Sequence, residues 1–102
     1  MALVARVSRY QGDPQRIEDG IRFVLETDIS QMAGNRGAVL LVDRSSGRVM
    51  TLTFWDSDQA ASGSAGAAAS LREQIAQAFG AGAAPTTETY EVVSPSRFPP
   101  NA

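Results

Sequence analysis

Cysteine and histidine are both absent from this sequence of 102 residues. The lack of cysteine excludes disulfides, thiolate nucleophiles and zinc–thiolate sites. The lack of histidine removes the usual base that activates a serine nucleophile, so no Ser–His pair can be assembled. Carboxylates are scattered over the predicted surface without a metal-binding pattern, and we therefore predict no metal site. A buried carboxylate remains available for general acid–base catalysis.

Lysine is absent as well, because all nine basic residues are arginine; with eleven acidic residues the net charge is −2. No basic cluster is present, which argues against nucleic-acid binding because phosphates require concentrated positive charge. We find no apolar run of about 18 residues and no leader-like segment, so we expect no membrane span and, by default, a cytoplasmic location. The length suits a single domain at residues 1–93, followed by a proline-rich tail at 94–102.

The stretch at residues 37–56 predicts a β-hairpin. Residues 39–42 are an apolar run, and residues 49–55 are rich in the β-branched and aromatic side chains that strands favour. Residues 44–47 supply turn chemistry, with Gly47 free to adopt a positive φ. A loop of this length predicts a definite register, in which Asp43 pairs with Arg48, Leu41 with Met50 and Val39 with Leu52.

The other elements follow from hydrophobic periodicity and from capping residues. Asp13 is a suitable N-cap before Pro14, and the helix after it should fade between residues 27 and 32. Gly20 inside that helix could allow a close approach to the sheet. Gly80 is a natural residue to end the second long helix. The predicted elements are a strand at 3–10, a helix at 14–26, the hairpin strands, a short helix at 59–62, a helix at 67–79 and a strand at 86–93.

This βαββαβ order predicts an α+β, ferredoxin-like fold: a four-stranded antiparallel sheet with the helices on one face. The strand at residues 38–42 then lies at an edge of the sheet, although it is apolar on both sides. An exposed apolar edge on a sheet with one open face promotes aggregation. We therefore predict a homodimer that forms through the sheet faces, related by a two-fold axis.

Four short segments carry a family resemblance: residues 37–43, the Ser46-Gly47 turn, residues 51–60 and residues 90–93. The passage from the strand through Trp55 to Asp-Ser-Asp is similar to a W-E-S-x-E-A pattern. On these segments the chain resembles the dimeric α+β barrel superfamily, and within it the antibiotic-biosynthesis-monooxygenase-like small proteins. The resemblance implies two sheets that pack into a dimeric barrel. The family includes cofactor-independent oxygenases of aromatic polyketides, haem-degrading enzymes and quinol monooxygenases.

Trp55 matches the tryptophan that lines the pocket in some members of this family. The haem degraders also use a histidine on the following helix and an asparagine in the first strand, and this chain has neither. The resemblance therefore implies a cofactor-independent monooxygenase, without haem or another cofactor, acting on a small aromatic or quinol molecule in an apolar pocket. The alternative is a non-catalytic dimer that binds a small apolar ligand or serves in a stress response or as an interaction module.

No catalytic residue can be assigned, but two residues are the main pocket candidates. Trp55 could stack on an aromatic substrate, although an aromatic residue at the end of a strand more often serves packing. Arg6 could hold an anionic or phenolate oxygen. The competing interpretation, which we favour for Arg6, is an ion pair with Glu88 or Glu91 on the adjacent last strand.

Five further aromatic residues complete the set of pocket candidates. A buried tyrosine usually forms a local hydrogen bond, though one tyrosine could steer a proton. The phenylalanines belong either to the core or to a pocket wall. A cavity of roughly a few hundred cubic ångströms, lined by the tryptophan and a tyrosine or arginine, would favour ligand binding or catalysis, whereas a filled interior would favour an interaction module. These candidates are Tyr10, Tyr90, Phe23, Phe54 and Phe79.

Overall fold

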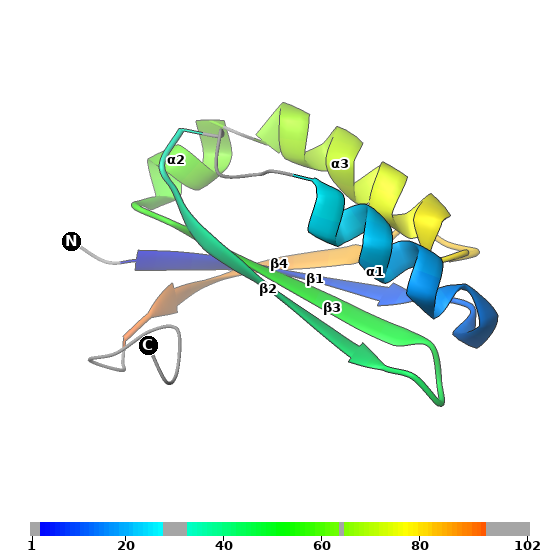
Figure 1. Cartoon of the computed structure of the whole chain (residues 1–102). Coiled ribbons are helices and arrows are strands. Elements are labelled where there is room, and N and C mark those ends of the chain that lie inside the picture. Colours follow the sequence, from blue (N-terminus) through cyan, green and yellow to red (C-terminus); the bar gives the residue numbers. More distant parts are fainter. Residues whose placement is uncertain (1–2, 28–32, 64, 94–102) are drawn as a thin grey trace.

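The computed structural model describes residues 3–27, 33–63 and 65–93. Four strands form one antiparallel sheet in the order β2-β3-β1-β4, with the helices on one face (Figure 1). The predicted ferredoxin-like α+β fold is confirmed, and so is the place of β2 at an edge. The elements are β1 (Leu3–Gln11), η1 (Pro14–Arg16), α1 (Ile17–Glu26), β2 (Asn35–Asp43), β3 (Arg48–Trp55), α2 (Asp58–Gly63), α3 (Ala65–Ala78) and β4 (Thr86–Val92).

The β2–β3 hairpin has the register that the sequence predicts. Gly47 has a φ of +80°, and it closes a loop of four residues. The Arg48 guanidinium donates to the Asp43 carboxylate at 2.7 Å across the base of the turn. β2 begins earlier than predicted, at Asn35, because a bulge between Asn35 and Gly37 lets the extra residues join the ladder. The confirmed pairs are Asp43 with Arg48, Leu41 with Met50 and Val39 with Leu52.

Helices α1 and α3 meet at a glycine. A Cβ atom built on Gly20 would lie 2.2 Å from Cδ1 of Phe79, whose side chain is fully buried. The close approach predicted at Gly20 is therefore real, but its partner is the end of α3 rather than the sheet. Around this contact the core cluster comprises Tyr10, Ile17, Val49, Ile75, Ala76 and Phe79.

Capping contacts set the helix ends. Asp13 accepts a hydrogen bond from the Gln15 amide at 2.9 Å, and Ser57 Oγ accepts one from the Ala60 amide at 3.1 Å. At the end of α3, Gly80 has a φ of +70°, and the paired bonds of a Schellman motif run from its amide to the Gln77 carbonyl and from the Ala81 amide to the Ala76 carbonyl. Helix α1 ends at Glu26, at the start of the predicted fade; residues 28–32 and the tail at 94–102 lie outside the described segments.

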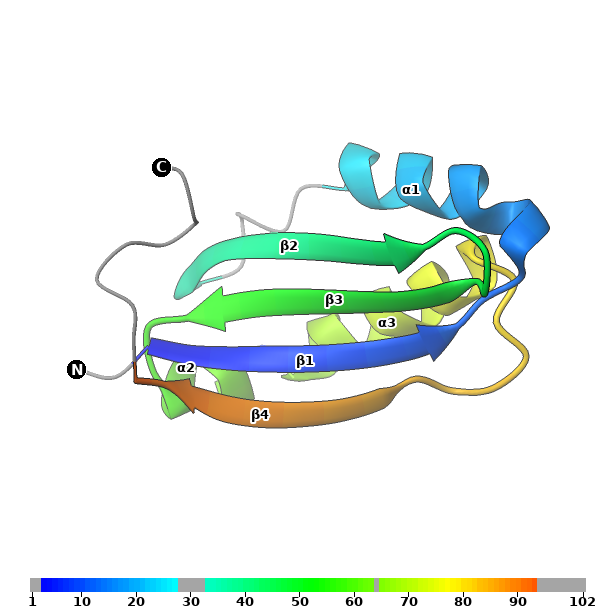
Figure 2. The same cartoon turned by 90° about the horizontal axis from the view of Figure 1, so that it is seen from below.

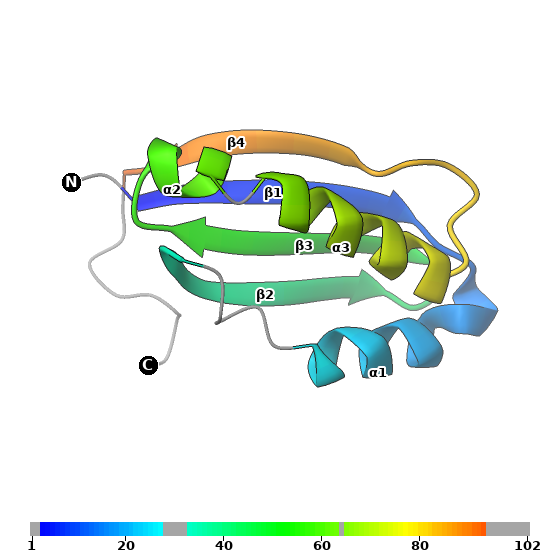
Figure 3. The same ribbon diagram turned by 90° about the horizontal axis from the view of Figure 1, so that it is seen from above.

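The two faces of the sheet differ in cover. Seen from above, α3 lies over the sheet, and α1 lies alongside the edge strand β2 (Figure 3). Seen from below, no described helix lies in front of the strands (Figure 2). β2 turns Leu40 and Val42 toward the helices, where they pack against the core, and leaves Leu41 48% exposed on the other face. No helix in the described part of the chain is both long and apolar enough to cross a membrane.

Candidate functional site

A cavity of about 290 Å³ lies between the helix-covered face of the sheet and helices α1 and α3. Its walls are mostly apolar, with a few convergent polar groups, which is the usual composition of a small-molecule site. The exposed residues Leu25 and Ala38 mark its open side, between the end of α1 and β2. Its volume, and the presence of Trp55 and Arg6 in its lining, match the cavity that would favour ligand binding or catalysis. The lining residues are Arg6, Ser8, Val24, Leu25, Thr27, Ala38, Val39, Leu40, Thr51, Thr53, Trp55, Ala68, Leu71, Arg72 and Ile75.

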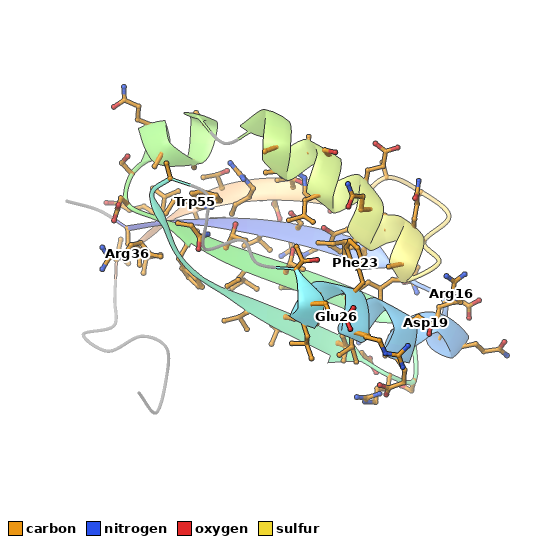
Figure 4. All side chains as sticks on the ribbon, turned by 45° about the horizontal axis from the view of Figure 1, so that its top comes forward. Arg16, Asp19, Phe23, Glu26, Arg36 and Trp55 are labelled. Atoms are coloured by element: carbon orange, nitrogen blue, oxygen red, sulfur yellow. The ribbon has the colours of Figure 1, made fainter. Side chains whose placement is uncertain are left out.

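Trp55 is the last residue of β3 and lies at the end of the sheet that α2 covers (Figure 4). Its side chain is 1% exposed and packs with Val4 and Ala61 in a second small core cluster. The indole Nε1–H donates to Thr53 Oγ1 at 2.9 Å, so the ring orientation is fixed by a hydrogen bond as well as by packing. Trp55 therefore both packs in the core and lines the cavity.

Arg6 lies beside the Trp55 ring rather than beside a carboxylate. Its guanidinium carbon is 5.1 Å from the ring centroid, a cation–π contact, and it also donates to the Ala61 carbonyl. The predicted ion pair with Glu88 or Glu91 is wrong. Side chains alternate along a strand, so Glu88 shares the open face with Arg9 and pairs with it, while Thr89 stands opposite Arg6.

Arg72 is a cavity residue that the sequence did not single out. One of the nine arginines, Arg97, lies outside the described residues, and six of the other eight form ion pairs. The two that lack a carboxylate partner within the described segments are Arg6 and Arg72, and both line the cavity, whose described lining contains no acidic residue. The paired arginines are Arg9, Arg16, Arg22, Arg36, Arg44 and Arg48.

The two cavity arginines also act on each other. Burial lowers the pKa of Arg6, and the positive charge of Arg72 lowers it further. Two like charges that meet inside a mostly apolar cavity destabilise each other, and an anion between them would relieve that repulsion. The cavity is therefore chemically suited to an anionic oxygen on an apolar ligand.

Tyr10 lies in the core and is not among the residues that line the cavity. Its side chain is 4% exposed, and its hydroxyl group is fully buried. Burial raises the pKa of Tyr10, while the nearby Thr51 hydroxyl, the charge of Arg72 and the Ser8 hydroxyl oppose that rise.

The remaining aromatic candidates do not line this cavity. Phe23 and Phe79 pack in the core between α1 and α3; Figure 4 shows Phe23 on the side of α1 that faces α3. The strand register places Phe54 and Tyr90 opposite Ala5, on the face away from the helices, where Tyr90 is 49% exposed. Among the described residues, no group of three or more acidic side chains is arranged to hold a metal ion.

Solved structures with similar architecture place this chain in a recognised fold. No family model matches the sequence, and no curated protein matches it closely enough to count as a relative. The monooxygenase ActVA-Orf6 of Streptomyces coelicolor, in complex with nanaomycin D, is 21% identical, covers 93% of each chain and superposes with a TM-score of 0.69. A putative antibiotic biosynthesis monooxygenase from Bordetella bronchiseptica is 15% identical, with 92% of this chain and 100% of the other covered and a TM-score of 0.73.

SnoaB of Streptomyces nogalater, a cofactor-independent oxygenase, is 16% identical over 97% of this chain and 99% of its own, with a TM-score of 0.60. The chain thus has the same fold as these antibiotic-biosynthesis-monooxygenase-like proteins, as its sequence segments suggested. At these identities the similarity defines the fold, and the activity has to be argued from the cavity.

Proposed function

We propose that the cavity binds a small aromatic or quinol molecule through an ionisable oxygen and that the protein oxidises it with molecular oxygen, as a cofactor-independent monooxygenase. The observation that carries this proposal is the pair Arg6 and Arg72, the two described arginines without a carboxylate partner, beside Trp55 in an apolar cavity. ActVA-Orf6 is a monooxygenase and SnoaB is a cofactor-independent oxygenase; their similarity to this chain supports the same reaction class.

The lining favours an aromatic ligand that carries negative charge. Leu71, Ile75 and Trp55 offer apolar and aromatic surface, and an aromatic pair contributes about 0.5–1.5 kcal/mol beyond the burial of its area. Hydrogen bonds to charged groups are worth about 1.5–3 kcal/mol each. The arginines therefore favour the phenolate or enolate form of the ligand over its neutral form.

The anionic form is the one that reacts with oxygen. An electron-rich phenolate or enolate can pass one electron to O₂, after which the two radicals combine into a carbon-bound peroxide anion. That anion takes up the proton that the substrate released when it ionised, which gives a hydroperoxide. Loss of water from that hydroperoxide converts a ring CH₂ into C=O, so one oxygen atom stays in the product and the other leaves as water. The protein's part is to stabilise the anion with Arg6 and Arg72 and to keep water away from the intermediates.

Oxygen uptake tests this proposal directly. We expect substrate-dependent uptake with at least one member of a panel of hydroquinones and anthrones. Arg72→Gln and Trp55→Phe should reduce it by roughly tenfold or more, because each removes one contact to the bound substrate. Arg9→Gln is the matched control, since Arg9 pairs with Glu88 on the opposite face of the sheet, and it should retain full activity. Uptake that is unchanged in the Arg72 and Trp55 variants would refute the assignment of the site.

A binding protein without turnover is the second candidate function. Among the described residues that line the cavity there is no carboxylate, and the sequence contains no histidine, so this part of the lining offers no ordinary base to take a proton from the substrate. Such a protein would bind the same ligands without consuming oxygen. Trp55 is the only tryptophan and lines the cavity, so its fluorescence reports occupancy. Saturable quenching without oxygen uptake from any bound compound would favour the binding protein.

We also propose that two copies pack through their open sheet faces. Leu41 is 48% exposed and Tyr90 49% exposed on that face, which is more apolar exposure than an edge strand tolerates in isolation. Light scattering coupled to gel filtration should give twice the mass of the chain. Leu41→Glu should produce monomers, whereas Arg44→Glu, at the exposed hairpin turn, should leave the mass unchanged. A wild-type monomer would contradict the dimer without affecting the cavity.

A further inference from the structure

The Trp55 indole determines how the Thr53 hydroxyl can bond to anything else. An indole Nε1–H can only donate, so Thr53 Oγ1, at 2.9 Å, is the acceptor of the bond between them. A hydroxyl has two lone pairs and one hydrogen, and this contact uses one lone pair. Within the described segments Thr53 donates to no other residue, so its hydrogen is available to a ligand.

The Thr53 side chain lies in the wall of the cavity. Thr53 and Trp55 are two residues apart on β3, so they share the helix-covered face of the sheet, and both line the cavity. Unlike a core residue, Thr53 is only partly buried. A molecule in the cavity can therefore reach its hydroxyl group.

Arg6 and Thr53 contact the same indole ring. They are direct partners in the β1–β3 ladder, where facing side chains have Cβ atoms about 4.5–5.5 Å apart. The Arg6 guanidinium carbon is 5.1 Å from the centroid of the Trp55 ring, and Thr53 Oγ1 is bonded to Nε1 of that ring. A guanidinium has five N–H groups, so the bond from Arg6 to the Ala61 carbonyl leaves others free to donate. Trp55 therefore holds a cation and a hydroxyl donor together at one end of the cavity.

We propose that Thr53 is a specificity-determining residue: its hydroxyl donates a hydrogen bond to the ligand oxygen that Arg6 holds. The cavity then selects aromatic molecules that carry an anionic or carbonyl oxygen at that position. This inference rests on the proposed function, because it concerns the same cavity and the same class of ligand. A site that hydrogen-bonds a ligand oxygen discriminates against the analogue without it, because the protein groups are then left unpaired.

Trp55 fluorescence titrations under nitrogen, which prevents turnover, test the inference. The probes are naphthol and the methylnaphthalene that carries its methyl group at the same carbon. At a pH where bound naphthol is ionised, Thr53→Val should bind it at least about tenfold more weakly than wild type, because a hydrogen bond to a charged oxygen is lost. Its affinity for methylnaphthalene should stay within about twofold of wild type, which would show that the cavity is intact.

Two further variants serve as controls. Thr53→Ser keeps the hydroxyl group and should recover most of the naphthol affinity. Thr89→Val is the matched control, because Thr89 is the partner of Arg6 on β4 but is not among the residues that line the cavity. It should bind both probes as wild type does.

Three results would overturn the inference. They are wild-type affinity of Thr53→Val for naphthol, an equal loss of affinity for both probes, and a loss in Thr53→Ser as large as the loss in Thr53→Val. The second result would mean that Thr53 only orients Trp55 and does not touch the ligand. Failure of the proposed function looks different: Arg72→Gln would then bind naphthol as well as wild type does, whatever the Thr53 variants show.

Discussion

Replacing Gly20 with alanine separates helix propensity from tertiary packing, because the two predict opposite signs. Alanine is better than glycine inside a helix by about 1 kcal/mol, so propensity alone predicts stabilisation. The structure predicts the reverse. The added Cβ would lie 2.2 Å from Cδ1 of Phe79 and 2.4 Å from Cγ and Cε1, far inside any normal contact.

The magnitude follows from how little Phe79 can move. Its ring is 0% exposed and is held by Ile17 and Ile75, so it cannot swing out to solvent. Overpacking of this kind costs about 1–3 kcal/mol, and three contacts this short place it at the upper end. After the gain in helix propensity is subtracted, we expect Gly20→Ala to lower the free energy of unfolding by about 2 kcal/mol. For a domain of this size, that corresponds to a melting temperature about 8–16 °C lower.

Urea unfolding followed by circular dichroism measures this difference. Gly66→Ala in α3 is the matched control: no atom lies within 4 Å of its added Cβ, so it should be neutral or stabilising by up to about 1 kcal/mol. The double variant with Phe79→Leu should lose less stability than the two single changes together, since the smaller side chain removes the clash. Equal or greater stability of Gly20→Ala would refute the packing of α1 on α3. Because Ile75 also lines the cavity, Gly20→Ala should weaken ligand binding too.

Three further predictions concern single residues. Burial raises the pKa of Tyr10, so the neutral hydroxyl contributes its full stability below the ordinary tyrosine pKa of about 10. That contribution is lost as pH rises through the pKa of Tyr10 in the folded protein, so Tyr10→Phe should unfold less readily than wild type in alkali. Hydrogen bonds, first from Arg48 and then from Ser45 and Ser46, lower the pKa of Asp43, so its contribution fades as pH falls below about 4, and acid titration of Asp43→Asn should lack that part of the loss. Gly80→Ala should cost about 1–2 kcal/mol in urea unfolding, because φ is +70° there. A variant that unfolds like wild type in its assay would contradict the burial of Tyr10, the hydrogen bonds of Asp43 or the backbone conformation of Gly80, respectively.

The sequence predicted the hairpin well because its information is local. Alternation with a period of two, a four-residue turn and Gly47 together define one register, and the structure has that register. The edge position of β2 followed from chain order and the handedness of crossovers. Trp55 and Arg6 were candidates for the same reason: an aromatic and a charge stood at unusual places on predicted strands, and both line the cavity.

The parts that the sequence did not predict depend on tertiary contacts. Arg6 was matched with Glu88 or Glu91 on the neighbouring strand, but the β1–β4 register gives Glu88 to Arg9. Glu91 does share the face of Arg6, opposite Val4, but the Arg6 guanidinium lies against Trp55 and the Ala61 carbonyl instead. Arg72 gave one weak signal, its place four residues after Ala68 on the border of the apolar stripe of α3. That it lacks a carboxylate partner within the described segments is visible only once the other arginines have been paired.

The pKa of a phenol bound in the cavity tests the central claim most directly, because its two determinants have opposite signs. Burial among apolar side chains raises the pKa of a phenol, whereas two arginines that have no carboxylate partner in the described segments lower it. Absorbance titration of protein-bound naphthol, whose anion absorbs beyond the protein bands, should give a pKa about 1–3 units below the free value, and Arg72→Gln should reverse most of that shift. A bound pKa at or above the free value would show that Arg6 and Arg72 do not hold an anionic oxygen in this cavity.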